Sequence, residues 1–261
     1  MQVTEIFNKY KLANGEGLSL KAGKLDLQVR RISMGWGFKC EPEGELWHEV
    51  DLQLKTVDFS VSECDLYQTG KSNSLVVAPA LPDKPLVLKN SGMRILPGQT
   101  MNFFVKIPLW VQFYFGEQVA DKFIVEYPLL SLSHTWFGEP DSGEPAYAMG
   151  GFYQKEIGRL GVQPWDAVCP VHISNNSTLL LEVERLIVRV ENLALITHEN
   201  HLMTSLLSIE YTGKEQVSAA SYRLDKSIHG EGYQHIAPPR NSGNRSSMKI
   251  NFHFIKNWYQ I

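Results

Sequence analysis

The sequence predicts an all-β protein, an antiparallel β-sandwich whose chain forms two packed sandwich-like halves. Three observations support this fold class. Apolar residues recur at every second position in segment after segment, as they do along one face of a strand. Turn-forming residues separate these segments at intervals typical of all-β folds. A helical pattern is almost absent, and its best candidate is one short turn around 117–121.

The first strands combine this alternation with a change of phase. Apolar residues occupy every second position over 25–29, and the series continues on the other parity over 32–40. Because side chains alternate between the two faces of a strand, a change of parity within one strand requires an extra residue, a β-bulge, or a strand that crosses from one sheet to another. Similar shifts occur over 54–57 and 183–186. We therefore expect long, bent strands at the corners of a sandwich.

The remaining apolar runs predict further strands, each bounded by turn residues. They cover 75–78, 86–88, 101–107, 109–115, 123–127, 168–173, 206–211, 217–224 and 248–255.

Two long segments interrupt the pattern. Residues 133–158 are rich in glycine, proline and aromatic residues, and 225–247 are rich in glycine, serine, asparagine and basic residues. Long loops in a compact fold are usually functional or disordered. The first segment leads us to expect an N-terminal sandwich-like half, 1–132, an aromatic loop, 133–158, and a C-terminal half, 159–261.

Charge and hydropathy argue against several classes of function. The chain of 261 residues has 25 Lys and Arg against 28 Asp and Glu, a net charge of -3, which favours neither nucleic acid nor an anionic membrane as a partner. Its most apolar stretch, 101–115, contains Lys106 and Pro108 and is too short to cross a bilayer as a helix. The first residues lack a secretory apolar region. We expect no membrane insertion and a cytoplasmic location, and the sequence leaves the oligomeric state open.

A phosphate-binding loop is suggested and then rejected. Gly70-Lys71-Ser72 looks like the end of such a loop, but the required upstream glycine is replaced by Asp65 and no strand-to-helix pattern follows. No bound cofactor is therefore expected.

Metal ligands and disulfides are equally weakly indicated. His198 and His201 are the only close histidine pair, and their sequence context predicts a polar hairpin turn rather than a metal site. The other histidines are isolated in the sequence. Cys40, Cys64 and Cys169 are odd in number and widely spaced, so we expect free thiols.

Two charged segments invite interpretation. Alternating charges over 182–191 are expected to form the exposed face of a half-buried strand. Arg240 and Arg245 flank a glycine turn, where they would form either a small anion site or part of a solvated loop.

The best candidate site is the aromatic loop, which places three carboxylates among five aromatic side chains. Aromatic faces stack on ligands, and carboxylates accept hydrogen bonds from ligand hydroxyl groups. In a second interpretation, the aromatic residues cap the open end of a sandwich core and the carboxylates remain in water. The candidate ligand-binding residues are Trp136, Phe137, Glu139, Asp141, Glu144, Tyr147, Phe152 and Tyr153.

Three functions are compatible with these observations. The leading hypothesis is a non-enzymatic binding or interaction module with a protein or small-molecule partner, because no catalytic signature is found. The alternative is a carbohydrate-binding or glycoside-hydrolysing protein that uses two of Glu139, Asp141 and Glu144, provided that the separation of these carboxylates is suitable. A metal-dependent enzyme would require histidines or Cys169 to converge in space.

Several short motifs recur together in a known family. They are Leu96-Pro97-Gly98, Ile107-Pro108 at the end of an aromatic strand, Gly138-x-Pro140-x-x-Gly143, Pro170-Val171-x-Ile173-x-Asn175-x-Ser177 and Glu184-Arg185-Leu186. With these motifs the chain resembles an uncharacterised prokaryotic all-β family, domain of unknown function family 432, over about residues 20–225. The resemblance implies no activity, cofactor or catalytic residue. It implies a turn at Gly138, Pro140 and Gly143, and a hairpin between two strands at Asn175 and Ser177.

Overall fold

The computed structural model describes residues 3–41, 45–116, 122–150, 153–198, 201–213, 219–241 and 248–249. The chain folds into two compact units. The first unit comprises 1–80, 108–131 and 163–166, and the second comprises 81–107, 132–162 and 167–261. Both are built almost entirely of strands, so the all-β prediction is confirmed. The predicted contiguous halves, 1–132 and 159–261, stay a prediction.

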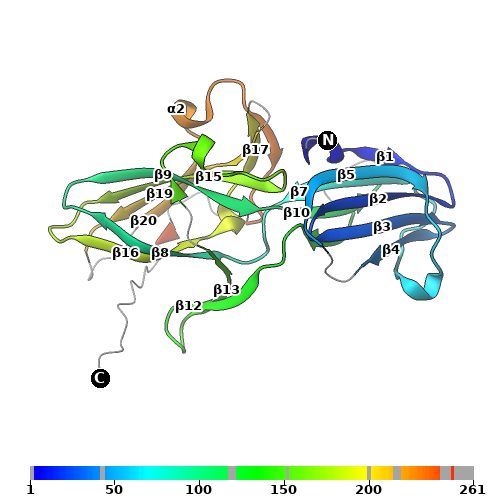
Figure 1. The fold of residues 1–261 in the computed structure, drawn as a ribbon, viewed down its shortest axis with the longest axis horizontal. Helices are drawn as coiled ribbons and strands as arrows, with labels where there is room; N and C mark the ends of the chain where they lie inside the picture. Colours follow the sequence, from blue (N-terminus) through cyan, green and yellow to red (C-terminus); the bar gives the residue numbers. More distant parts are fainter. Residues whose placement is uncertain are drawn as a thin grey trace. The chain divides into compact units, whose positions relative to one another are not determined.

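The first unit contains two antiparallel sheets, and Figure 1 shows β2 to β5 side by side in one of them. The five-stranded sheet has the order β5 (Trp47–Thr56), β2 (Glu16–Gly23), β3 (Leu25–Ile32), β4 (Gly35–Cys40) and β6 (Asp65–Gln68). The four-stranded sheet has the order β1 (Lys9–Lys11), β7 (Ser74–Ala80), β10 (Trp110–Phe115) and β11 (Phe123–Pro128). Single turns, α1 (Val3–Ile6) and η1 (Val61–Glu63), complete the unit.

Aromatic side chains join these two sheets face to face. Phe38 of β4 makes an edge-on contact with Phe113 of β10, with ring centroids 5.2 Å apart, and its ring centroid lies 6.4 Å from that of Tyr127 of β11. Phe38 and Phe113 are almost completely buried. Such contacts between strands of different sheets are typical of a sandwich core.

The second unit is a larger sandwich. Its four-stranded sheet has the order β12 (Ser133–Phe137), β13 (Glu144–Met149), β8 (Leu86–Ile95) and β16 (Leu181–Val188). The main path of its nine-stranded sheet is β21 (Gln234–Ala237), β17 (Leu195–His198), β18 (His201–Thr204), β15 (Asp166–Asn175), β19 (Leu206–Tyr211), β20 (Ala219–Arg223) and β22 (Met248–Lys249). Two further strands of this sheet lie outside that order: β9 (Thr100–Pro108) pairs with β15 and with β14 (Tyr153–Gln154). Single turns are η2 (Ile157–Arg159), η3 (Val190–Asn192) and α2 (Lys226–His229).

Only one of the three predicted phase shifts is a β-bulge. In β16 the pairing with β8 shifts between Val183 and Arg185, which confirms the bulge expected there. The prediction at the first shift was wrong, because β3 and β4 are separate strands joined by a turn and pair without a shift. Arg31 keeps the phase of β3 and is itself buried. At the remaining shift, β5 ends at Thr56 before Val57.

The expected hairpin at Asn175 and Ser177 was also wrong. Asn175 ends β15, which belongs to the nine-stranded sheet, whereas the next strand, β16, belongs to the four-stranded sheet. The segment between them is therefore an arch from one sheet to the other. Two further predictions, the turn at 117–121 and the strand at 250–255, lie outside the described residues.

Candidate functional site

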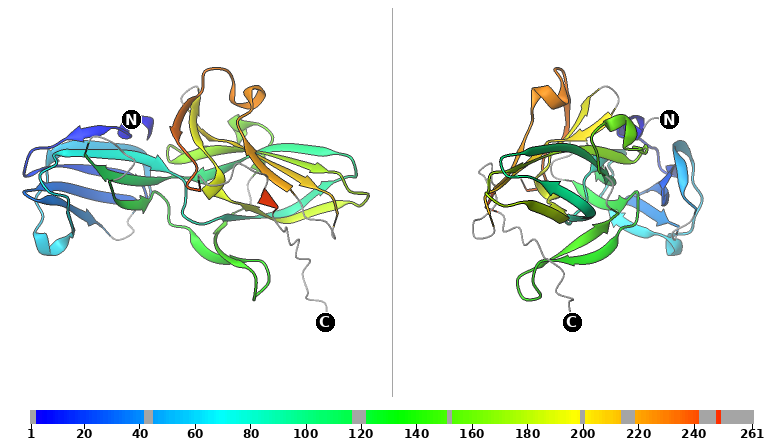
Figure 2. Two further views of the ribbon diagram at one scale, coloured as in Figure 1. Left: turned by 180° about the vertical axis from the view of Figure 1, so that it is seen from behind. Right: turned by 60° about the vertical axis from the view of Figure 1, so that its left-hand side comes forward.

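Strands β12 and β13 form an antiparallel hairpin that carries most of the candidate residues. They pair from Ser133 with Ala148 to Phe137 with Glu144. β13 joins the rest of its sheet only through a short parallel pairing of 147–149 with 86–88 of β8. The remainder of the hairpin is drawn in Figure 2 as a green ribbon extending away from the other strands of the second unit.

Two glycines shape the turn of this hairpin. Gly138 has φ +105°, a region that other residues rarely adopt. A Cβ on Gly143 would lie 2.6 Å from the Phe137 carbonyl oxygen and even closer to the Trp136 indole nitrogen. The Glu139 carbonyl accepts hydrogen bonds from the Gly143 amide at 2.8 Å and from the Trp136 indole at 3.1 Å. The motif around Pro140 is therefore a tight turn, and both of these hydrogen bonds end on the Glu139 carbonyl group.

The two aromatic residues of β12 have opposite environments. Phe137 is 5% exposed and packs in a small core with Val87, Ala146 and Ile187. Its neighbour Trp136 is 46% exposed, because successive side chains of a strand point to opposite faces. The cap interpretation therefore describes Phe137, and of the two only Trp136 presents a ring to solvent.

Arg185 of β16 contacts β12 near the turn of the hairpin. Its guanidinium group lies 5.4 Å from the centroid of the Phe137 ring and donates a hydrogen bond of 2.9 Å to the Trp136 carbonyl oxygen. This contact fixes the backbone of β12 directly beneath the exposed indole.

The three candidate carboxylates are not equivalent. Glu139 and Asp141 lie at the turn, where both are exposed. Glu144 forms a two-point ion pair with Arg189, with distances of 2.6 Å to Nη1 and 2.5 Å to Nη2. Since a guanidinium group occupies both Glu144 oxygens, this carboxylate is placed as an anchor of the hairpin, and Glu139 and Asp141 remain open to a ligand.

The other candidate aromatic residues that the structure describes are less exposed than Trp136. Tyr147 is buried at the root of the hairpin, where its hydroxyl donates to Asp83 at 2.8 Å and its ring faces the Lys84 ammonium group at 5.0 Å. Tyr153 belongs to β14 in the other sheet and packs against Phe103. Phe152 lies outside the described residues.

A half-buried charged cluster lies behind the Glu144 ion pair. The side chains of Arg189 and Glu191 are only 17% and 18% exposed. The exposed charged face that we expected over 182–191 therefore does not include these two residues. Burial lowers the pKa of Arg189, but the hydrogen bond and charge of Glu144 outweigh it and the net shift is upward. Burial raises the pKa of Glu191 despite the nearby Arg189. The cause is desolvation of the carboxylate, which disfavours its charged form.

The raised pKa of Glu191 predicts a pH dependence of stability. A carboxyl group with a higher pKa in the folded state binds protons more readily there, so the free energy of unfolding should fall as pH rises from the unfolded value of 4.5 through the folded pKa. Glu191→Gln should remove this part of the decline and stabilise the chain at neutral pH. Thermal unfolding from about pH 4 to pH 8 measures this. An unchanged pH profile in the variant would contradict the assignment.

A separate groove of about 360 Å³ lies on the second unit and has a lining of mixed polarity. Its lining residues come from β9, β15, β19, β20 and α2, and include Asn102, Phe104, His172, Arg223 and Ile228. The volume is within the range of small-molecule pockets. Sequence reasoning missed this groove, because its residues come from segments far apart in the chain.

One wall of the groove contains a row of hydrogen bonds. His172 Nδ1 lies 2.6 Å from Asn102 Oδ1, and Nε2 lies 2.9 Å from the Ser174 hydroxyl oxygen. An amide oxygen only accepts, so Nδ1 carries the hydrogen and Nε2 accepts from Ser174. Serine hydrolases have a row of serine, histidine and carboxylate, whereas the amide of Asn102 takes the place of the carboxylate here. Ser174 does not line the groove, however, and we assign the row to joining β9 with β15.

The remaining basic and histidine candidates have structural partners. Arg240 donates from Nε and Nη2 to the Leu81 carbonyl oxygen at 2.9 and 2.6 Å, and Arg245 lies outside the described residues. In the backbone register of the β17–β18 hairpin, His198 is paired with His201. Within the described ranges, no three His, Cys, Asp or Glu residues gather so that they could hold a metal ion.

The cysteines are expected to differ in reactivity. All three are free; Cys40 is exposed, and Cys169 is fully buried, which raises the pKa of its thiol to about 12. Since the thiolate is the reactive form, a thiol reagent should modify Cys40 in the native chain and leave Cys169 unmodified. Mass spectrometry of the labelled chain measures this, with a denatured sample as the control in which all three thiols react. Rapid native labelling of Cys169 would contradict the prediction.

A family model decides the relationship of the chain to known proteins. The model described as protein of unknown function, DUF432, matches residues 6–256. The chain belongs to this family. No curated protein and no solved structure matches the DUF432 chain. Of its helices in the described residues, none is long and apolar enough to cross a membrane.

The DUF432 motifs around Gly98 and Asn175 meet in the structure. Asn175 is fully buried, and its amide nitrogen donates to the carbonyl oxygens of Ile95 and Leu179, both at 2.8 Å. Its side-chain oxygen accepts from the amide and the hydroxyl of Ser177 at 3.1 and 2.7 Å. The Asn175 backbone also accepts from the Gly98 amide at 2.7 Å. These family motifs therefore tie the two sheets of the second unit together.

Proposed function

We propose that this chain is a non-enzymatic, cytoplasmic binding module, and that the β12–β13 hairpin presents Trp136 to a protein or small-molecule partner. One observation carries this proposal: the Trp136 indole, almost half exposed, lies next to the turn of the hairpin, and the backbone of Trp136 is hydrogen-bonded to Arg185. Tryptophan supplies large contact area with few rotatable bonds, which explains its enrichment at the centres of binding interfaces.

The fixed backbone supports the same proposal. Binding costs less free energy when the contacting side chain is already ordered. The Trp136 indole is hydrogen-bonded to the Glu139 carbonyl, and its own carbonyl is bonded to Arg185. Little ordering is therefore left for a partner to impose.

The charges of the turn favour a basic partner. Glu139 and Asp141 lie on the turn that follows Trp136, whereas the cations of β16 and its end, Arg185 and Arg189, already contact groups of the hairpin. A lysine or arginine side chain would place its cation on the indole face and near these carboxylates. We therefore favour a basic peptide segment as the ligand.

A carbohydrate is the second candidate, because an exposed indole beside hydrogen-bond acceptors also suits a sugar ring. The arrangement favours carbohydrate binding over hydrolysis. Glu144 is engaged by Arg189, and the other two carboxylates of the turn are open to solvent.

Calorimetric titration with two probes tests the proposal and separates the candidates. A lysine-rich peptide and a neutral oligosaccharide are titrated into the wild-type chain and into Trp136→Ala. We expect peptide binding that weakens at least about tenfold in the variant, as for an interface anchor. Trp47→Ala in the first unit is the matched control, because that indole is 37% exposed.

Peptide affinity that is the same in Trp136→Ala and wild type would contradict the assignment to this hairpin. Saturable binding of the oligosaccharide alone would replace the basic peptide by a sugar. Binding of neither probe would contradict the ligand chemistry proposed here.

A further inference from the structure

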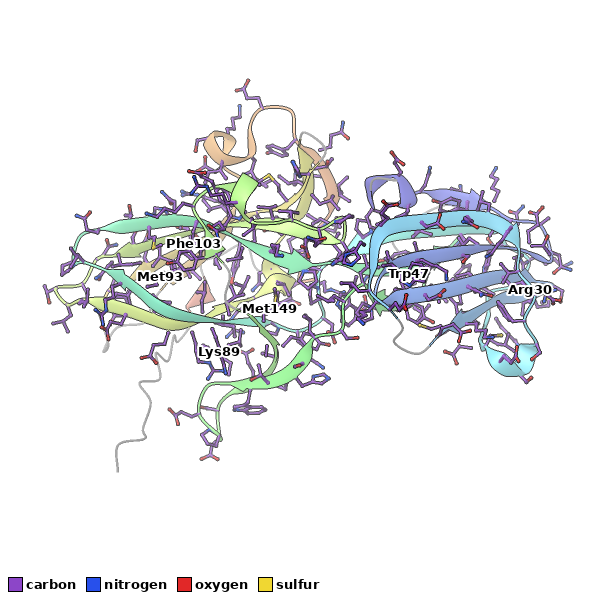
Figure 3. The ribbon with its side chains drawn as sticks, viewed as in Figure 1. Arg30, Trp47, Lys89, Met93, Phe103 and Met149 are labelled. Atoms are coloured by element: carbon purple, nitrogen blue, oxygen red, sulfur yellow. The ribbon has the colours of Figure 1, made fainter. Side chains whose placement is uncertain are left out.

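Strand β5 leaves one long edge of the first unit unpaired in the part of the chain that the structure describes. It pairs with β2 on one side only and spans 10 residues. The other strands that end a sheet path among the described residues are shorter, and the longest of them, β16, has 8 residues and a β-bulge. Figure 3 labels Trp47 at the beginning of β5. An open edge of this length is a template for pairing with another strand.

Three common protections of an edge strand are absent from the second half of β5. Residues 51–56 pair with β2 in an unbroken register, from Asp51 with Lys21 to Thr56 with Glu16. The irregularity in this pairing lies earlier, between Asp51 and Trp47. Proteins commonly block an edge by a bulge, by proline or by an inward-pointing charge. The segment 51–56 has none of these three features, because it contains no bulge and no proline and its charged residues, Asp51 and Lys55, lie on the outer face.

An apolar side chain on this segment also lacks cover. Leu52 and Leu54 lie opposite Leu20 and Leu18 of β2, so both are on the inner face of the sheet. Leu52 is 9% exposed, whereas Leu54 is 59% exposed. The inner apolar row therefore continues to the edge and ends there.

We propose that a second copy of this chain pairs antiparallel with β5, about a two-fold axis that passes through Gln53. In this register, Asp51 lies directly opposite Lys55 of the partner subunit, and the reciprocal pair forms as well. Leu54 lies opposite Leu52 of the partner subunit, which extends the inner apolar row across the axis. Opposed charges and opposed apolar residues both stabilise neighbouring strands.

Three other registers are less favourable. An axis through Asp51 would place two aspartates directly opposite each other, and like charges in that position destabilise a sheet. An axis through Leu52 would pair Lys55 with Glu49 of the partner subunit, and Glu49 lies in the irregular part of β5. A register shifted by one residue would place the inner face of one subunit's sheet and that of the partner subunit's sheet on opposite sides of the joined sheet.

The interface is small, since it consists of one short strand pairing. Interfaces of this size belong to weak complexes, so the dimer should form in a concentration-dependent manner. This inference concerns the first unit and is independent of the function proposed for the hairpin.

Sedimentation velocity of the full chain over a range of concentrations tests the proposal. We expect the average mass to rise toward that of a dimer. Asp51→Lys should weaken the dimer about tenfold, because both ion pairs become like-charge pairs. The double variant Asp51→Lys with Lys55→Asp should restore it. Glu49→Lys is the matched control on the same strand and should change the affinity by less than about twofold.

A monomer at every concentration would overturn the proposal, as would a dimer that Asp51→Lys leaves intact. An effect of Glu49→Lys as large as that of Asp51→Lys would overturn the register.

A second variant avoids any effect of charge on folding. Gln53→Cys, made in a Cys40→Ser background, places a thiol on the axis at an exposed position. Mild oxidation should join two chains by a disulfide, since directly opposed residues of an antiparallel pair are close enough for one. Glu49→Cys in the same background should not crosslink. Absence of a covalent dimer in Gln53→Cys would contradict the proposal.

Discussion

Replacing Asn175 by alanine is expected to lower the free energy of unfolding of the second unit by about 4 kcal/mol. The change removes the Asn175 donor from the Ile95 carbonyl and the Asn175 acceptor from the Ser177 amide. It also removes one of the two donors to the Leu179 carbonyl, which keeps the Ser177 hydroxyl. Each such buried group costs about 1–3 kcal/mol when unsatisfied. Urea unfolding, followed by tryptophan fluorescence and by circular dichroism, measures the loss.

Two further variants define what Asn175 contributes. Asn175→Asp keeps one acceptor but turns an oxygen toward two carbonyl oxygens, so it should destabilise the unit at least as much as alanine does. The neighbouring Asn176 is exposed, and Asn176→Ala should change the stability by less than about 0.5 kcal/mol. Equal stabilities of the two alanine variants would show that the Asn175 bonds do not hold the arch.

The adjacent aromatic residues of β12 are expected to respond very differently to alanine. Phe137→Ala should cost about 3 kcal/mol, because it removes a ring buried against Val87, Ala146 and Ile187. Trp136→Ala should cost less than about 1 kcal/mol, since it removes an exposed ring and one hydrogen bond. Thermal and urea unfolding of the two variants under the same conditions measure the difference.

This pair of variants also decides between the two interpretations of the aromatic loop. A loss of stability in Trp136→Ala as large as that in Phe137→Ala would make the indole a cap of the core and would remove the basis for a binding role. A small loss would leave Trp136 free for a partner, which the titration then tests.

The strands were predictable because their signal is local. The alternation of Leu25, Leu27 and Val29 is the buried face of β3. The same signal failed at Arg31, because a buried arginine breaks the apolar series without breaking the strand. Its guanidinium group donates to the carbonyl oxygens of Gly35, 2.6 Å away, and Gly70, 3.2 Å away. The second partner lies 39 positions along the chain, where no local pattern points to it.

In the candidate site too, features set by neighbouring residues could be predicted, and contacts between residues far apart in the sequence could not. The sequence identified the hairpin turn from its glycines, and strand alternation alone separates Trp136 from Phe137. It could not distinguish Glu144 from Glu139 and Asp141, because the partner of Glu144, Arg189, is 45 positions away.

The groove could not be predicted, because its lining residues lie far apart in the sequence. Asn102 and His172 of its wall are 70 positions apart and carry no motif. Their joint presence in one groove follows only from the pairing of β9 with β15.

The alternation of chain segments between the two units bears on how the protein folds during its synthesis. Trp165 belongs to the first unit, where it is buried and its carbonyl accepts from the Leu109 amide at 2.8 Å. A ribosome has therefore already made much of the second unit before the first unit can close. The second unit in turn waits for Arg240, which binds the Leu81 carbonyl. We expect nascent chains to stay protease-sensitive until Arg240 has been synthesised.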